Sequence, residues 1–371
     1  MVETYLLPVR TAVTVFPLLA LLVMLPVAVI SYRRRGRAGG WTTLVFYCFL
    51  FYLLATFLQT VIPLPADPTG YCTTRSYAST PQLSPFNFVD VVSTRAAVSG
   101  TWLNPAMWST ALNLVLLAPL SLFLRYLSGT RFLAATALGL GTSLFLELTQ
   151  LTGLWFIYPC AYRLFSVDDL ILNTAGAALG WLLAGPLIRV LPDLDPGRDR
   201  RRYANRVTTS RRVLALLTDV VVFGVLTVVL VGLIQLFGGP AEVRGPAIAA
   251  LAVVYFLLAP VQTGSTLGKR AMLLKVERTD GRHAGPFALL VRNGVLLSPL
   301  WLLWLALEVD HWDVFGSPQQ LLIPVGLLIS LLVVGVWTPL AVFFGDEPAP
   351  YERLSRTQNV AIVSTEPAAK H

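Results

Sequence analysis

The chain has 371 residues, of which 55% are hydrophobic and only 13% charged, and its formal net charge is +8. So few polar side chains cannot cover an ordinary soluble protein, which excludes that class and predicts an all-α, polytopic integral membrane protein. The basic residues lie in short loops between apolar runs, where they orient membrane helices, so nucleic acid is not expected as a partner.

Apolar runs of about 20 residues are long enough to cross a bilayer, and the chain contains nine of them. We therefore predict about nine transmembrane helices surrounded by the lipid bilayer. The first run has only Arg10 ahead of it and no small-residue cleavage site behind it, so a secretory signal peptide is not expected. The runs cover approximately residues 13–30, 44–62, 107–124, 132–154, 169–191, 213–237, 248–261, 287–307 and 321–344.

The arginines predict the orientation. A basic cluster at 33–37 follows the first run, and the positive-inside rule places it in the cytoplasm. The N-terminus, the Pro-, Ser- and Thr-rich loop at 63–105 and the loop at 155–167 are then external, and the C-terminus is cytoplasmic. Because the basic residues are nearly all arginine, as is typical of a GC-rich bacterial genome, we expect the plasma membrane of a bacterium.

A stretch rich in Pro, Asp, Gly and Arg at 192–210 predicts a cytoplasmic linker. It divides the chain into a first module at 1–191 with five spans and a second module at 211–363 with four. Residues 364–371 are expected to form a disordered tail.

The fourth and fifth runs each carry one polar stripe. In the fourth run, Ser143, Glu147 and Gln150 fall at i, i+4 and i+7 of one helical face. A carboxylate that faces lipid is costly, so we expect the two stripes to face each other near the external surface, with Arg163 between them. This arrangement predicts a ligand-binding site. Its candidate residues are Glu147, Gln150, Arg163, Asp168, Asp169 and Asn173.

Structural explanations compete with this interpretation. Asp168 can simply cap the fifth helix, because acids suit the positive end of a helix dipole. Gly176 and Gly180, on the same face as Asp169, form a small-xxx-small pair that is typical of close helix packing. Glu147 has apolar neighbours and no capping role, so a functional site and a buried structural pair both stay open there.

The polar stretch and three upstream segments also follow a family pattern. It consists of Glu147, Gln150, Tyr158, Arg163, Asp168, Asp169, Asn173, Gly176 and Gly180, preceded by Ser84-Pro85-Phe86, Asn113 and Pro119. This pattern resembles the VanZ-like family, small membrane proteins whose namesake is tied to resistance to teicoplanin-type glycopeptide antibiotics. Ser166 departs from it, because an acid is expected there. The resemblance implies a role in glycopeptide resistance, but it does not imply any particular chemical reaction.

A second pattern follows the linker. It consists of Arg211, Arg212, Asp219, the segment GSTLGKR at 264–270, Asp280-Gly281, Arg292 and the closing YERLSRTQNVAIV. This pattern resembles the RDD family, named for one arginine and two aspartates, although Glu352 stands where the second aspartate is expected. The polar residues that the resemblance singles out are Arg212, Asp219, Lys269, Arg292 and Glu352.

Asp219 has two possible roles in the second module. Arg212 lies seven residues before it on the same helical face, so an arginine that reaches back from the cytoplasmic end can neutralise it. The other possibility is an ion-carrying carboxylate, because some RDD proteins have been linked to ion transport.

No cofactor and no metal site are predicted. The three histidines, His283, His311 and His371, are far apart and fall on both sides of the predicted membrane. Cys72 and Cys160 both fall in predicted external loops, where the redox environment permits disulfides, and we predict that they are bonded.

Two classes of function are consistent with these patterns. The first is a non-catalytic envelope protein that binds a glycopeptide or a cell-wall precursor at the outer face, with Arg163 paired to an anionic group of the ligand. The second is a membrane enzyme on a lipid-linked substrate, with Glu147 as general base. Transport of an ion or proton through the second module is a further alternative.

Overall fold

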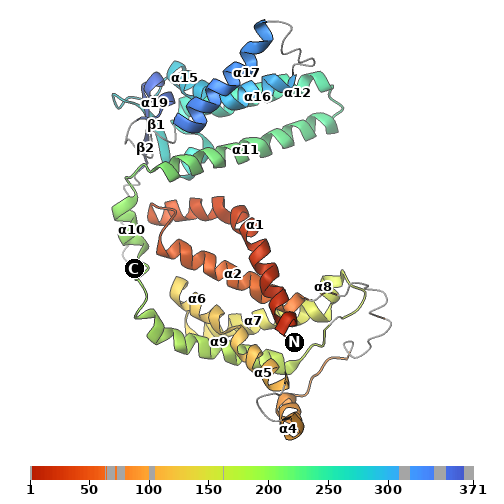
Figure 1. The fold of residues 1–371 in the computed structure, drawn as a ribbon. Coiled ribbons are helices and arrows are strands. Elements are labelled where there is room, and N and C mark those ends of the chain that lie inside the picture. Colours follow the sequence, from red (N-terminus) through yellow and green to blue (C-terminus); the bar gives the residue numbers. More distant parts are fainter. Residues whose placement is uncertain are drawn as a thin grey trace. The chain divides into compact units, whose positions relative to one another are not determined.

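The computed structural model describes residues 2–62, 64, 72, 80–99, 105–161, 163–308, 318–337 and 348–362. Within these ranges the chain is almost wholly helical, as Figure 1 shows, which confirms the prediction of an all-α, multi-pass membrane protein. The chain forms two compact units. Unit 1 comprises Met1–Val23 and Gly39–Leu194, and unit 2 comprises Met24–Ala38 and Asp195–His371. The predicted tail at 364–371 lies outside the described residues.

Seven helices of the described residues are long and apolar enough to cross a membrane. Two further apolar helices, Pro286–Leu296 and Pro324–Val336, are shorter, so the predicted count of nine is not confirmed. The seven are Leu7–Arg35, Trp41–Val61, Ala106–Ser128, Phe132–Leu151, Val167–Ile188, Thr209–Leu236 and Ala241–Thr263.

The predicted eighth span is broken into two helices, α15 (Pro286–Leu296) and α16 (Ser298–Glu308). Pro299 is the second residue of α16, and because proline has no amide hydrogen it cannot continue a preceding helix. Hydropathy alone does not register this break, because both pieces are apolar.

Unit 1 is built around α9 (Val167–Ile188), which packs against three neighbouring helices, α5, α6 and α7 (Figure 1). The amino-terminal helix α1 (Val2–Arg35) contributes its residues up to Val23 to this unit. The other helices are α2 (Trp41–Val61), α4 (Asn87–Ser99), α5 (Pro105–Leu116), α6 (Ala118–Ser128), α7 (Phe132–Leu151) and α8 (Gly153–Phe156).

Two glycines allow α9 to approach the backbone of its neighbours. A Cβ atom at Gly176 would lie 1.9 Å from the carbonyl oxygen of Leu114, and one at Gly180 would lie 2.1 Å from that of Ala118. Both distances are much shorter than a van der Waals contact, so glycine is the one residue type that fits at either position. The small-xxx-small pair therefore packs α9 against α5 and α6.

The chain leaves α7 through a left-handed turn. Three consecutive residues after Gly153, namely Leu154, Trp155 and Phe156, have φ of 57°, 57° and 69°. L-residues disfavour this conformation by roughly 1–2 kcal/mol each, so contacts must hold the turn. The indole nitrogen of Trp155 donates to Thr149 Oγ1 at 3.1 Å, which ties the turn back onto α7.

Unit 2 is organised on α11 (Thr209–Leu236), which packs against α14 and α12. Its other helices are α10 (Pro196–Tyr203), η2 (Ala241–Val243), α12 (Arg244–Val253), η3 (Val254–Leu258), α13 (Ala259–Thr263), α14 (Leu267–Ala271), α15, α16, α17 (Pro318–Ser330), η4 (Leu331–Trp337) and α19 (Pro350–Ser355).

Unit 2 also contains two short strands that the sequence did not predict. The strands β1 (Leu274–Arg278) and β2 (Thr357–Ala361) pair antiparallel, with Leu274 opposite Ala361. Alternate residues of β1 are buried, but an alternation over only five residues is too short to distinguish a strand from a loop.

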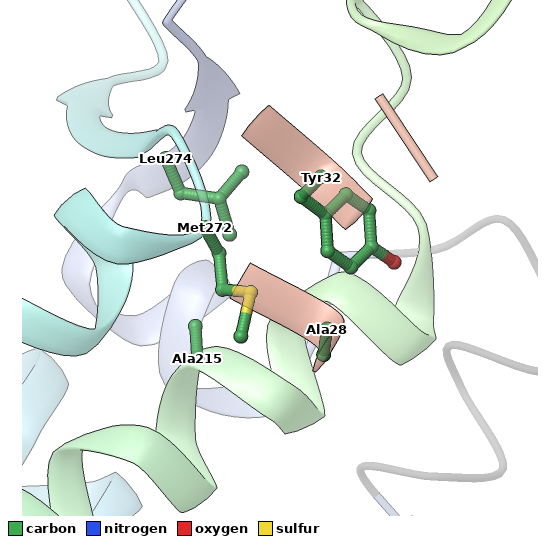
Figure 2. Packing of buried hydrophobic residues seen from close by; sticks show 5 residues of the cluster. All are labelled: Ala28, Tyr32, Ala215, Met272 and Leu274. Atoms are coloured by element: carbon green, nitrogen blue, oxygen red, sulfur yellow. The ribbon is translucent and has the colours of Figure 1, made fainter. Parts of the chain in front are cut away.

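A stretch of α1 belongs to the hydrophobic core of unit 2. Ala28 and Tyr32 pack against Ala215, Met272 and Leu274, as Figure 2 shows, and all five are buried. Residues from the beginning of the chain therefore complete a core whose other walls come from α11 and from the segment that leads into β1.

Candidate functional site

Polar side chains gather in unit 1 where α2 and α7 end and α9 begins. We call the eight residues that form this group the polar cluster. It consists of Asn113, Ser143, Glu147, Gln150, Arg163, Asp168, Asp169 and Asn173. Six of these are the candidates predicted from the sequence, and the structure brings all six together where α2 and α7 end and α9 begins.

Glu147 lies in the last turns of α7 and is only 4% exposed. Its Oε2 accepts a hydrogen bond of 3.0 Å from the backbone amide of Ser166, the N-cap residue of α9. None of the ion pairs between described residues involves Glu147, Asp168 or Asp169. These carboxylates are thus held by neutral donors, without a paired cation.

The two aspartates of α9 have different partners. Asp169 Oδ1 accepts a hydrogen bond from the side-chain amide of Asn113 on α5. Asp168 lies in the first turn of α9, but its Oδ2 accepts from the backbone amide of Phe88 on α4, at 2.8 Å. Asp168 therefore joins α9 to α4, and this bond to another helix is not the helix cap that its position in the sequence suggested.

Two buried acceptors of the polar cluster lack a donor within the described part of the chain. They are Oδ1 of Asp168 and Oδ1 of Asn173, whose residues are 5% and 3% exposed. The Asn173 amide nitrogen is used, because it donates to Ser143 Oγ at 3.0 Å. Buried polar atoms are normally hydrogen-bonded, so these oxygens are free to accept from a ligand.

Arg163 lies at the C-terminal end of α2. Its Nη1 donates to the carbonyl oxygens of Thr60 at 3.2 Å and Gln59 at 3.4 Å, and Gln150 Nε2 also donates to Thr60, at 2.9 Å. A cation suits the last carbonyls of a helix. The Arg163 charge also acts on Glu147 and Asp169, so it belongs to the same electrostatic environment as the carboxylates.

The polar cluster is therefore rich in acceptors, since it combines three carboxylates with one arginine. Such a set suits a ligand that brings N–H or O–H donors, or a positive charge, together with one group that pairs with Arg163. Among the described residues, no group of three or more His, Cys, Asp or Glu side chains is placed to hold a metal ion.

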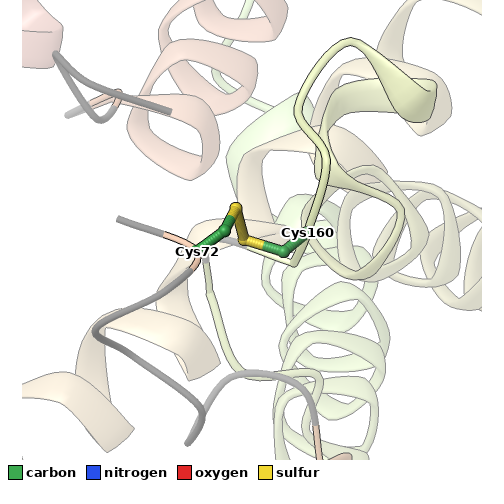
Figure 3. The surroundings of a disulfide bond; sticks show 2 residues. All are labelled: Cys72 and Cys160. Carbon is green, nitrogen blue, oxygen red and sulfur yellow. A yellow bond between two sulfur atoms is a disulfide. The ribbon is translucent and has the colours of Figure 1, made fainter. Parts of the chain in front are cut away.

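A disulfide joins the loop before α4 to the loop that carries Arg163. The bond connects Cys72 and Cys160, the pair named from the sequence, and Figure 3 shows it beside the ribbon of unit 1. Because Cys160 lies three residues before Arg163, the disulfide restrains the segment that presents the guanidinium.

We expect thiol labelling to test this disulfide. A maleimide should label neither Cys72 nor Cys160 until a reductant is added, because a disulfide has no free thiol. Single variants Cys72→Ser and Cys160→Ser should each expose the remaining cysteine to the reagent. Labelling of both residues in the untreated parent chain would contradict the bond.

The second set of polar candidates also assembles, within unit 2. We call Arg212, Asp219, Lys269, Arg292 and Glu352 the ion cluster, because each takes part in one of three ion pairs, two at Glu352 and one between Lys269 and Asp219. The sequence suggested that Arg212 neutralises Asp219, but the structure does not pair them. Seven residues of helix separate the two by about 10 Å along the axis, and closer partners come from α14 and α19.

Asp219 is a buried acceptor whose oxygens are occupied. Oδ1 accepts from Tyr255 Oη and from the Gly268 amide, each at 2.7 Å, and Oδ2 accepts from Thr266 Oγ1 at 2.6 Å. Lys269 Nζ lies 4.0 Å from Oδ2. Burial lowers the pKa of Lys269 to about 8, although the nearby Asp219 charge opposes this shift.

Glu352 on α19 holds the other half of the ion cluster. Its Oε1 accepts from Arg292 Nη2 at 3.3 Å and from Asn359 Nδ2 at 2.8 Å, and its Oε2 accepts from Arg212 Nη1 at 3.1 Å. Glu352 and Arg292 are 2% and 1% exposed. The longer side chain found in place of the expected aspartate thus reaches two arginines at once.

Several residues of both sites were not singled out by sequence reasoning. Thr60 contributes its backbone carbonyl. Every residue has a carbonyl, so the residue type does not reveal this role. Tyr255 binds Asp219 but lies in an apolar run, without a polar stripe to mark it. Thr266 also binds Asp219, and it was noted only as part of a family pattern. Asn113 was noted only as part of a family pattern, and the structure places it on Asp169.

Both halves of this membrane protein match known families. The model of the VanZ/LLP1 family matches residues 49–189, and the model of the RDD family matches residues 206–346. The chain therefore carries a VanZ-like region in its N-terminal half and an RDD region in its C-terminal half. No curated protein and no solved structure matches the chain.

Proposed function

We propose that unit 1 is a binding protein of the bacterial envelope, and that its polar cluster holds a teicoplanin-type glycopeptide or a cell-wall precursor. The proposal takes the cluster to lie at the outer face of the plasma membrane, with the N-terminus outside and the C-terminus in the cytoplasm. Binding there lowers the susceptibility of the cell to the drug. The VanZ/LLP1 match, which spans every residue of the cluster, supports the choice of pathway.

The observation that carries this proposal is a pair of buried acceptors, Asp168 Oδ1 and Asn173 Oδ1, that find no donor among the residues the structure describes. A glycopeptide or a wall precursor presents many N–H and O–H groups, which are the partners that such oxygens require. Glu147 and Asp169 add negative charge that favours an ammonium group. Arg163 supplies the one cationic contact, to an acidic group of the same ligand.

A membrane enzyme remains the second candidate, and one observation favours it. Glu147 is buried, without a paired cation among the described residues, and a carboxylate in that environment is a suitable general base. A catalytic site would change the covalent structure of its lipid-linked substrate. Mass spectrometry of the wall-precursor pool in strains with and without the protein therefore separates catalysis from binding.

Ion transport through the second module is the less favourable candidate. Asp219 already accepts three hydrogen bonds and lies near Lys269, so its oxygens are not available to a passing cation without the loss of these contacts. This geometry supports a structural role for Asp219.

We expect Glu147→Gln and Arg163→Ala to remove drug tolerance. Each deletes a charged hydrogen-bonding group worth about 1.5–3 kcal/mol, so ligand affinity should fall about tenfold or more. The measurement is the minimum inhibitory concentration of teicoplanin in a deletion strain that carries each variant at equal membrane abundance.

Two controls make this measurement specific. Asp90→Asn changes an exposed carboxylate on α4, outside the polar cluster, and should keep full tolerance. Asp219→Asn changes unit 2 and should also keep tolerance at equal abundance. Loss of tolerance in Asp219→Asn, with retention in Glu147→Gln and Arg163→Ala, would refute the proposal and favour the second module.

A further inference from the structure

A mainly apolar cavity of about 200 Å³, partly open to its surroundings, lies between α2, α6 and α7 of unit 1. Its walls include Leu53 and Phe57 of α2, Leu120 of α6, and Leu146 of α7. The hydroxyl of Tyr52, which also lines it, is used elsewhere, because it donates to the carbonyl oxygen of Leu116 at 2.7 Å. Thr56 and Thr142 also line the cavity, so its walls are mainly but not wholly apolar.

The cavity begins next to the polar cluster. Thr56 lines it and lies one helical turn before Thr60, whose carbonyl oxygen accepts from Gln150 and Arg163. One turn of helix rises about 5.4 Å. On α7, the wall residue Leu146 directly precedes Glu147 in the chain. Along α2 the cavity therefore lies one turn before the polar cluster, and along α7 the two share the same turns, since Ser143 of the cluster lies between the wall residues Thr142 and Phe145.

Mainly apolar walls offer few hydrogen-bond partners to ordered water. In a bilayer the available apolar occupant is a hydrocarbon chain. A chain that lies in the cavity brings its head group to within about one helical turn of Thr60, whose carbonyl oxygen the polar cluster binds. An ordinary anionic phospholipid head does not suit this excess of acceptors, whereas a head with amino, hydroxyl or amide donors does.

We infer that the ligand of unit 1 is a lipid with a sugar- or peptide-bearing head group, whose hydrocarbon chain lies in the cavity while the head binds the polar cluster. This inference rests on the proposed function and names its substrate class. It assigns Thr56, Thr142 and Leu146 to recognition of the chain, and Arg163, Glu147 and Asp169 to recognition of the head.

Photo-crosslinking of the full-length protein in nanodiscs tests this inference. The probe is glucosaminyl diacylglycerol with a diazirine in one acyl chain, and the comparison probe is phosphatidylglycerol with the same chain. Crosslinks of the amino-sugar probe should map to residues that line the cavity. Equal labelling of the cavity by phosphatidylglycerol would mean that bulk lipid fills it, and would overturn the selection of the head group.

A matched pair of α7 variants asks whether the cavity is needed. Thr142→Phe fills the cavity, whereas Leu138→Phe adds an aromatic ring at an exposed position one turn earlier on the same helix. Crosslinking should fall at least about fivefold in Thr142→Phe and stay unchanged in Leu138→Phe, because burial of the chain supplies most of its affinity. Unchanged crosslinking in Thr142→Phe would overturn the inference.

A measurement on the parent protein covers the case in which Thr142→Phe does not fold. Competitors with the same amino-sugar head and chains of 4 or 16 carbons should differ about tenfold or more in their effect on crosslinking. Equal competition would show that the chain contributes nothing. If these lipid tests fail while Arg163→Ala still removes drug tolerance, the proposed function stands and the lipid inference falls.

Discussion

Replacement of Glu352 with glutamine should reduce the free energy of unfolding of unit 2 by about 3–5 kcal/mol, the range for breaking a buried ion pair on one side. Glu352 is 2% exposed and is the acidic partner of both Arg212 and Arg292. Glutamine keeps the shape but removes the negative charge, so Arg292 is left buried without a counter-charge. Hydrogen exchange of the β1 and β2 amides in nanodiscs measures the loss locally.

The matched control is Glu277→Gln on β1. Glu277 pairs with Lys275 at 2.5 Å, but these side chains are 23% and 41% exposed, so water screens the pair. Exposed pairs contribute about 0–1 kcal/mol, and this variant should exchange nearly as slowly as the parent chain. Equal effects of the two variants would show that burial of the Glu352 pairs does not stabilise unit 2.

Replacement of Gly176 with alanine should be the most damaging small substitution in unit 1. The new methyl carbon would lie 1.9 Å from the Leu114 carbonyl oxygen, and because that atom belongs to the backbone of α5, no rotamer change relieves the clash. The helices must move apart, at a cost of about 3 kcal/mol or more, the upper end of the range for overpacking. Thermal unfolding of the protein in detergent, followed by circular dichroism, measures this cost.

Gly141→Ala on α7 is the control for this substitution. A Cβ atom at Gly141 would meet nothing within 4 Å, so the methyl group fits, and alanine favours a helix over glycine by about 1 kcal/mol. The control should leave the melting temperature unchanged or raise it. A similar fall in both variants would show that loss of glycine flexibility, and not the close approach of α9 to α5, determines the result.

The class of the molecule and the position of its polar cluster were predictable, because each depends on a long and repeated signal. The cost of a carboxylate in lipid forces polar stripes inward, so the helical spacing of Ser143 and Glu147 was enough to predict that they contact α9. In the structure Ser143 Oγ accepts from Asn173, and Glu147 accepts from the amide of Ser166. The two family patterns were equally readable, since they consist of residue types at fixed intervals.

What the sequence did not disclose depends on backbone groups and on contacts between distant segments. Arg163 binds carbonyl oxygens at the end of α2, and Asp168 binds the amide of Phe88, and neither partner is encoded by a side chain. The pairing of β1 with β2 joins segments far apart in the chain. The ion cluster was anticipated as a set of residues, but its pairing required the positions of α14 and α19.

The passage of α1 through both units bears on how this two-family chain can be divided. Ala28 and Tyr32 pack in the same hydrophobic core as Met272. A gene fragment that begins at the linker would therefore encode an RDD region without these two core residues. The two regions are consequently not independent domains that can be exchanged as they stand. A chimeric protein that carries the RDD region must also include the part of α1 that belongs to unit 2.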